Sequence, residues 1–250
     1  MITSHHQALV ICYFTALILW AVIFKIYPDI WPRREAHNFS HPWREVGWAL
    51  LAILVTLAIG QLYIRNWLLP SADSIRFLVD SFNQIIIFCP LLLLLFIRRH
   101  PLSSAWLPTD RIWIRILVGI SLALIAILFF TLVRKGSDSW IVVVPQVYHP
   151  KNLPYLVQVF LEDIAVAILF VRFRSALGLW QTVVLVAVLF ASGHIPALLA
   201  EGVAINELES LVLDSILAIC VISIIQRSAD IWWFWCIHFA MDMMQLYAVS

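Results

Sequence analysis

Long apolar stretches decide the fold, and residues 154–174 are the most informative of them: PYLVQVFLEDIAVAILFVRFR. At about 1.5 Å of rise per residue, a helix of this length spans the roughly 30 Å hydrocarbon core of a bilayer. The stretch nevertheless carries Glu162 and Asp163 near its middle. An ionisable group at the bilayer centre costs about 2.5–3.5 kcal/mol, so such groups usually face a protein interior or a water-filled cavity and serve a function.

The rest of the chain has the same apolar character. Of its 250 residues, 63% are hydrophobic and 12% are charged, whereas soluble domains carry about 25% charged residues. Hydropathy therefore predicts an integral membrane protein, an all-α bundle with about eight transmembrane helices. The expected helices cover residues 7–27, 46–64, 75–97, 112–133, 154–174, 179–200, 208–226 and 230–249.

The two parts of the chain differ in the polar residues that their apolar stretches contain. Residues 1–150 hold the first four expected helices and no motif, whereas residues 151–250 hold four helices with a set of embedded acids and histidines. A formal net charge of +1 indicates no basic face for nucleic acid. The expected partners are the lipid bilayer and membrane-anchored proteins or peptides.

The distribution of basic residues predicts an orientation, because Lys and Arg gather in cytoplasmic loops. When the loop between the first two helices is placed in the cytoplasm, both termini lie outside. Trp232, Trp233 and Trp235 then lie near the cytoplasmic surface, where we expect them to join an aromatic belt. The cytoplasmic loops hold Lys25, Arg33, Arg34, Arg44, Arg98, Arg99, Arg111, Arg115, Arg172, Arg174 and Arg227, against Arg65, Arg76, Arg134, Lys135 and Lys151 outside.

Four polar residues on three of the last four helices are predicted to share one layer of the membrane. Counted from the outer helix ends, Glu162, His194, His238 and Asp242 lie about 9–16 Å deep. His238 and Asp242 are four residues apart, so they project from one helix face, and we expect Asp242 to orient the imidazole. Pro196 cannot donate a backbone hydrogen bond, which predicts a loosened helix beside His194.

Three short motifs resemble those of the CPBP intramembrane proteases, the family of type II CAAX prenyl endopeptidases and Abi bacteriocin-processing proteins. They are ED at 162–163 for the family's Glu-Glu pair, FASGH at 190–194 for FxxxH, and HFAMD at 238–242 for HxxxN or HxxxD. Asp163 replaces the second glutamate of the family pattern. Ala167 stands where the family has an arginine.

The resemblance implies glutamate-type peptide hydrolysis with no metal and no other cofactor. Glu162, helped by His194, would deprotonate a water for attack on the scissile carbonyl. His238, held by Asp242, would stabilise the oxyanion or protonate the leaving amine, and Asp163 would tune the acidic pair. Such an enzyme would cut membrane-anchored proteins or peptides for their maturation, in the outer half of a prokaryotic cytoplasmic (inner) membrane.

Two other functions remain open. Glu162, His194 and His238 together supply the His₂Glu ligand set of a catalytic zinc, so a metalloprotease is one alternative. A non-catalytic membrane scaffold or immunity-type protein of the same fold is the other, and Ala167 in place of the family arginine favours it. Asp214 is a further acid within an apolar helix, and we expect it to lie near the same site.

Overall fold

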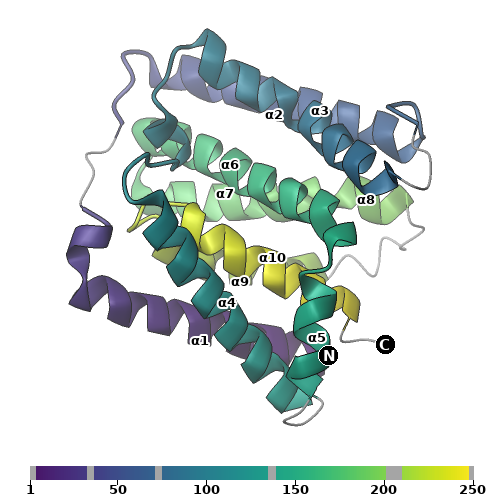
Figure 1. Ribbon diagram of the computed structural model, residues 1–250. Helices are drawn as coiled ribbons and strands as arrows, with labels where there is room; N and C mark the ends of the chain where they lie inside the picture. The colour runs from purple at the N-terminus through teal and green to yellow at the C-terminus, as the bar shows by residue number, and fades with distance from the viewer. Residues whose placement is uncertain (1–3, 33–36, 71–74, 135–138, 201–209, 248–250) are drawn as a thin grey trace.

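The computed structural model describes residues 4–32, 37–70, 75–134, 139–200 and 210–247 (Figure 1). Within these ranges the chain is helical and contains no strand, which confirms the predicted all-α class. Short 3₁₀ turns (η1, Pro28–Ile30; η3, Leu102–Ala105; η4, Pro150–Asn152) connect some of the helices. The α-helices are α1 (Ser4–Ile26), α2 (Pro42–Ile64), α3 (Arg76–Ile97), α4 (Ile112–Arg134), α5 (Ser139–Val147), α6 (Leu153–Ala176), α7 (Leu179–Gly193), α8 (Ile195–Ala200), α9 (Ser210–Ile225) and α10 (Trp232–Tyr247).

Among the described helices, four are long and apolar enough to cross a membrane by length and composition, namely α1, α2, α3 and α4. The helices α7 and α9 are apolar but have only 15 and 16 residues. They are about 23–24 Å long, which is shorter than the roughly 30 Å hydrocarbon core. The structure therefore does not confirm the expected eight spans. It contains four candidate spans among the described residues.

The helix expected over residues 179–200 is two helices. The helix α7 ends at Gly193, and the short α8 begins at Ile195. The backbone N–H of His194 donates to the carbonyl of Ala191 at 3.2 Å, which is the tighter i→i−3 contact of a helix end. Pro196 has no N–H to continue the helical ladder. The predicted loosening is thus a complete break, and His194 lies at it.

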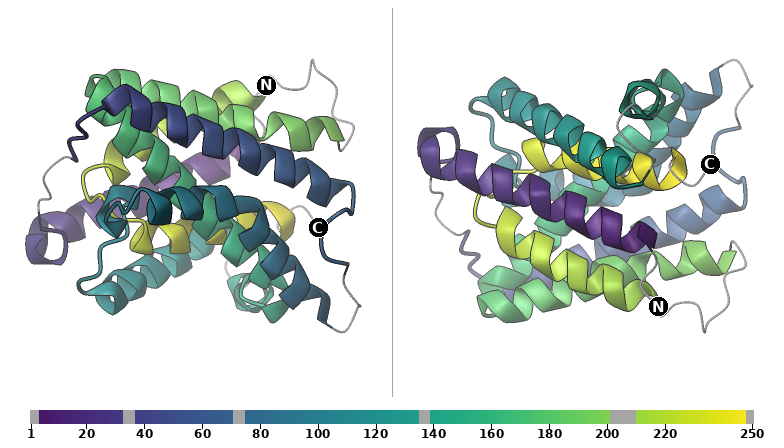
Figure 2. Two further views of the ribbon diagram at one scale, coloured as in Figure 1. Left: turned by 90° about the horizontal axis from the view of Figure 1, so that it is seen from above. Right: turned by 90° about the horizontal axis from the view of Figure 1, so that it is seen from below.

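The helices α6 and α10 lie side by side in the middle of the bundle, between the N-terminal helices (Figures 1 and 2). The helices α2 and α3 pack on α6, whereas α1 and α4 pack on α10. The backbones of α4 and α10 approach closely at Gly119. A Cβ atom at this position would lie 2.5 Å from the carbonyl oxygen of Trp233, so only glycine fits there. This arrangement brings together the two helices that carry the acidic pair and the HFAMD motif.

Of the three tryptophans near the start of α10, Trp233 faces the protein, so the expected aromatic belt is wrong for Trp233, whereas Trp232 and Trp235 are half-buried. Trp233 is fully buried, stacks on Trp20 with ring centroids 4.6 Å apart, and donates its indole N–H to the hydroxyl of Ser228. Trp232 and Trp235 donate theirs to backbone carbonyls of the segment before α4 and of α6. A buried indole needs such an acceptor, which the protein supplies at all three positions.

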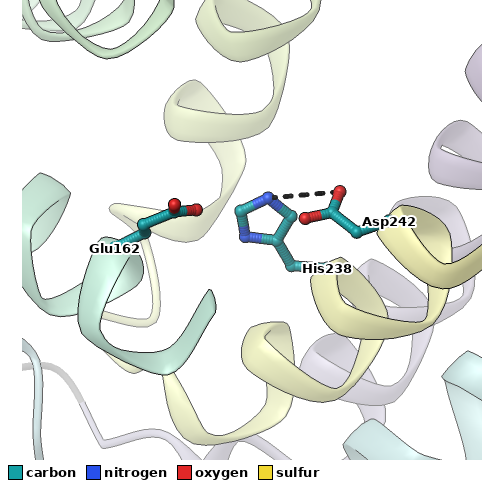
Figure 3. A group of neighbouring side chains, drawn as sticks. All are labelled: Glu162, His238 and Asp242. Atoms are coloured by element: carbon teal, nitrogen blue, oxygen red, sulfur yellow. Dashed lines mark ion pairs between the residues drawn. The ribbon is translucent and has the colours of Figure 1, made fainter. Parts of the chain in front are cut away.

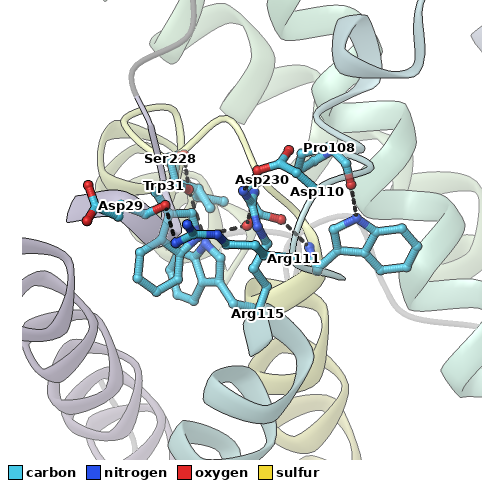
Figure 4. A network of polar contacts seen from close by, with 11 residues as sticks. Asp29, Trp31, Pro108, Asp110, Arg111, Arg115, Ser228 and Asp230 are labelled. Carbon is cyan, nitrogen blue, oxygen red and sulfur yellow. Dashed lines mark hydrogen bonds and ion pairs between the residues drawn. The ribbon is translucent and has the colours of Figure 1, made fainter. Parts of the chain in front are cut away.

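A polar network ties the loops together at one end of the bundle (Figure 4). Asp230, fully buried before α10, accepts hydrogen bonds from Arg115 at 2.9 Å, from the indole of Trp31 at 2.7 Å and from the backbone N–H of Trp232 at 2.8 Å. Arg115 also pairs with Asp110 at 2.7 Å. Loops that the charge distribution predicted on one side of the membrane therefore meet at one end of the molecule.

Candidate active site

A cavity of about 550 Å³ lies between α1, α6, α7, α9 and α10. All the residues predicted to form the site line it, although they come from α6, from the α7–α8 junction and from α10. Asp214 of α9, expected nearby, lines it as well. The predicted set is Glu162, Asp163, His194, His238 and Asp242.

Glu162 points across the cavity toward the imidazole of His238 (Figure 3). Glu162, His238 and Asp242 each place one potential ligand atom within 4.8 Å of the other two. Gln158, one helical turn earlier on α6, donates its amide N–H to Oε1 of Glu162 at 2.8 Å. This bond engages one oxygen of the Glu162 carboxylate. The other oxygen is left for the group that Glu162 forms with His238 and Asp242.

Asp163 holds His238 in place, and the expectation that Asp242 does so is wrong. The Nδ1 atom of His238 lies 2.9 Å from Oδ1 of Asp163, whereas its Nε2 atom lies 3.8 Å from Oδ1 of Asp242. The second distance is an ion-pair separation and not a hydrogen bond. The reason is the packing of α6 beside α10, which brings Asp163 closer to the ring than the neighbour one turn away on the same helix.

His194 approaches the same cavity from the break between α7 and α8. The ring of Phe190 meets its imidazole edge-on, with centroids 5.0 Å apart. His194 lines the cavity together with Glu162 and Asp242, but it is not part of the close group of three.

Two residues of the cavity were missed in the sequence. Gln158 is four residues before Glu162, so helical spacing alone would have placed it beside the carboxylate. Tyr13 of α1 is 6% exposed and lines the cavity together with Asp163, Asp214 and Asp242. No local pattern marks Tyr13, because it lies in the part of the chain that carries no motif.

The cavity is acidic and, over the described part of the chain, no lysine or arginine lines it. Ala167 at the family's arginine position is fully buried in the packing of α6. Arg172 is ten residues beyond Glu162, about 15 Å along the helix, and its hydrogen bonds go to the carbonyls of Ser104 and Ile168. No cation therefore replaces the missing arginine, and the two histidines are the only basic groups described at this site.

Comparisons with protein-family models, with curated proteins and with solved structures give no match to this chain. The class of protein is therefore defined by the fold and the site themselves. The fold is a helical bundle with four candidate membrane spans. The site is a set of carboxylates and imidazoles around a cavity inside that bundle.

Proposed function

We propose that this protein is an intramembrane endopeptidase of the glutamate type, related to the CPBP proteases, and that its helices cross the membrane about eight times. The observation that carries the proposal is the group formed by Glu162, His238 and Asp242, whose polar atoms lie within 4.8 Å of one another at the wall of a cavity. Hydrolysis within a membrane requires a polar cavity that holds water and a base positioned in it.

In the proposed mechanism Glu162 is the general base. Its carboxylate takes a proton from a water molecule in the cavity, and the water oxygen attacks the carbonyl carbon of the scissile peptide. Gln158 keeps the carboxylate in position through its 2.8 Å hydrogen bond. His194, which lines the same cavity, assists this proton transfer in the proposed mechanism.

His238 acts on the other side of the reacting carbonyl. Because Nδ1 is held by Asp163, Nε2 is the nitrogen that serves the substrate. Protonated Nε2 donates a hydrogen bond to the oxyanion and then delivers its proton to the leaving amine. Asp242, 3.8 Å from Nε2, stabilises the imidazolium. Ionised carboxylates cannot donate hydrogen bonds, so the hydroxyl of Tyr13 serves as the second donor to the oxyanion.

The proposed substrate is a membrane-anchored protein or peptide that is cut for its maturation. Beyond the polar group, the cavity wall continues over apolar side chains of α9, among them Leu217, Val221 and Ile225. These residues suit an apolar segment that enters from the bilayer. The site lies toward the end of the bundle opposite Asp230. The charge distribution predicts that this end faces outward, so the proposed site lies in the outer half of a prokaryotic inner membrane.

The proposal is tested by comparing membrane proteomes of cells that express equal amounts of wild type, Glu162→Gln and Asp80→Asn. Asp80 is the matched control, because it is a helix carboxylate paired with Arg76 at 3.5 Å and does not line the cavity. Protein termini produced near apolar segments should fall by about 10²–10⁴-fold in Glu162→Gln and persist in Asp80→Asn. Identical termini in all three, with an intact phenotype, would establish the non-catalytic scaffold instead.

A metal-dependent version is the second candidate, because Glu162, His238 and Asp242 form a group that could hold an ion. This set differs from the sequence-based one in that Asp242 replaces His194. Zinc ligands lie about 2.0–2.2 Å from the ion, so the three side chains would have to draw closer together. Asp163 would then orient the metal-bound imidazole. Activity lost to a chelator and restored by zinc would favour this version, and chelator-resistant activity would exclude it.

A further inference from the structure

A second cavity, of about 320 Å³, lies at the other end of the bundle. It is enclosed by the segment before α2, the first turn of α2 and the residues after α3. Its size is at the lower end of the range of small-ligand pockets, about 300–1,000 Å³. Unlike the acidic cavity of the candidate active site, this one has basic side chains at half of its lining positions, which are His37, His41, Arg44, Arg98 and His100.

Among the described residues that line this cavity, the one carboxylate is already engaged. Glu45 is 3% exposed, accepts a hydrogen bond from Arg98 and lies 3.0 Å from Nε2 of His100. Within the described ranges, the exposed guanidinium of Arg44 makes no side-chain hydrogen bond or ion pair. The cavity therefore keeps positive charge that Glu45 does not neutralise.

Arg172 adds to this charge from behind the cavity wall. It is fully buried, and its guanidinium lies 5.6 Å from the ring centroid of Phe39, a residue of the wall. Two carbonyl oxygens accept its hydrogen bonds, but its Nε and Nη2 atoms have no partner among the described residues. A buried guanidinium without a carboxylate partner is energetically costly, so an anion nearby would offset an existing penalty.

The same basic side chains act on the imidazole of His37. It lies at the cavity wall, outside the membrane-spanning helices, and is 3.2 Å from the hydroxyl of Ser103. Burial lowers the pKa of His37 below its ordinary value, and the positive charges of Arg172 and His100 lower it further. An anion in the cavity would act on this imidazole in the opposite sense.

We propose that this cavity binds a phosphate group, carried either by an anionic lipid headgroup or by a soluble phosphate compound. Guanidinium groups match the geometry of phosphate oxygens. Arg44 presents one without a described partner, and Arg98, whose Nη2 is bonded to Glu45, lies at the same wall. Trp43 and Trp48 on the adjoining turns of α2 are 63% and 45% exposed, as is typical of residues at the level of lipid headgroups. The site is independent of the proposed peptidase chemistry.

The test uses the purified full-length protein in a neutral detergent, with inorganic phosphate and dihexanoyl phosphatidic acid as probes. Binding is followed by the shift in thermal unfolding over a range of probe concentrations. Arg44→Gln should weaken binding by about tenfold, the loss expected for one charged hydrogen bond. Arg174→Gln is the matched control, because Arg174 is exposed at the same end and does not line the cavity.

The two probes separate the sources of the phosphate. Binding of phosphatidic acid alone would identify a lipid headgroup site, and comparable binding of both probes would identify a site for soluble phosphates. The proposal is overturned if neither probe binds at millimolar concentration. Equal weakening by Arg44→Gln and Arg174→Gln would also overturn it, since that result indicates only a general attraction of anions to this end.

Discussion

Two buried acidic clusters lie at opposite ends of α10, and they differ in how completely their hydrogen bonds are satisfied. At the start of the helix, both oxygens of Asp230 have donors, and the side chain is fully buried. At the cavity, Oδ2 of Asp163 has no partner among the described residues, and Asp242 is 3.8 Å from its nearest imidazole nitrogen. The first cluster is closed, whereas the second is open to a space that can hold water.

Under the proposed function, this difference separates structural acids from reactive ones. A buried charge is tolerated when it is paired and hydrogen-bonded. Both oxygens of Asp230 meet this condition, although Nε of Arg115 has no partner among the described residues. Such a group has no remaining acceptor for a substrate. Oδ2 of Asp163 is itself buried, so the carboxylates left for water and for a peptide are those of Glu162 and Asp242, which are partly exposed and line the cavity. The proposed chemistry is therefore assigned to the cavity cluster.

The largest effect should follow from breaking the closed cluster. Arg115→Gln leaves Asp230 as an uncompensated buried charge, which typically costs about 3–5 kcal/mol. We expect a strongly lowered unfolding temperature in detergent, while the fraction that remains folded keeps its peptidase activity. Arg111→Gln is the control, because Arg111 donates only an exposed hydrogen bond to the carbonyl of Asp29 and should change stability by about 0.5 kcal/mol or less. Equal stability of both variants would show that the network is not structural.

A smaller effect should separate the two carboxylates next to His238. Asp163→Asn replaces the carboxylate at Nδ1 with a neutral amide, a weaker acceptor, so the imidazolium is held and stabilised less well, and kcat/KM should fall by about 10²-fold. Asp242→Asn removes only the ion pair at 3.8 Å and should lower kcat/KM by about tenfold. The measurement is steady-state cleavage of a substrate identified in the proteome comparison. A larger loss for Asp242→Asn would restore the role that the sequence suggested for it.

The sequence indicated the all-helical class and the acids and histidines of the cavity, because apolar runs and depth along a helix are local properties, but not Gln158, Tyr13 or the full break after Gly193. Counting residues from helix ends placed Glu162, His194, His238 and Asp242 in one layer, and the structure places them around one cavity. The partner of His238 was wrong because the choice between Asp163 and Asp242 depends on how α6 and α10 rotate against each other. No spacing within one helix contains that information.

The closed cluster was invisible in the sequence for a related reason. Arg115 counted only as a loop charge, and Trp233 only as a membrane-surface aromatic. Their partners, Asp230 and Trp20, come from other helices or loops. Long-range pairing of this kind is set by packing, so composition and periodicity could predict that polar groups must be satisfied but not which groups satisfy them.

The smallest effect concerns the hydroxyl of Tyr13. In the proposed mechanism this hydroxyl donates a hydrogen bond to the oxyanion, which the ionised carboxylates of the open cluster cannot do. Tyr13→Phe keeps the ring that packs in the cavity wall and removes only the O–H. If this hydroxyl binds the oxyanion, kcat should fall by about tenfold while KM stays unchanged, because the bond forms only in the transition state. Tyr148→Phe is the control, since Tyr148 lies after α5, is 40% exposed and does not line the cavity. A lowered unfolding temperature with unchanged kcat would make Tyr13 a packing residue. The oxyanion would then depend on Nε2 of His238 alone, and a helix without any motif would have no part in the chemistry.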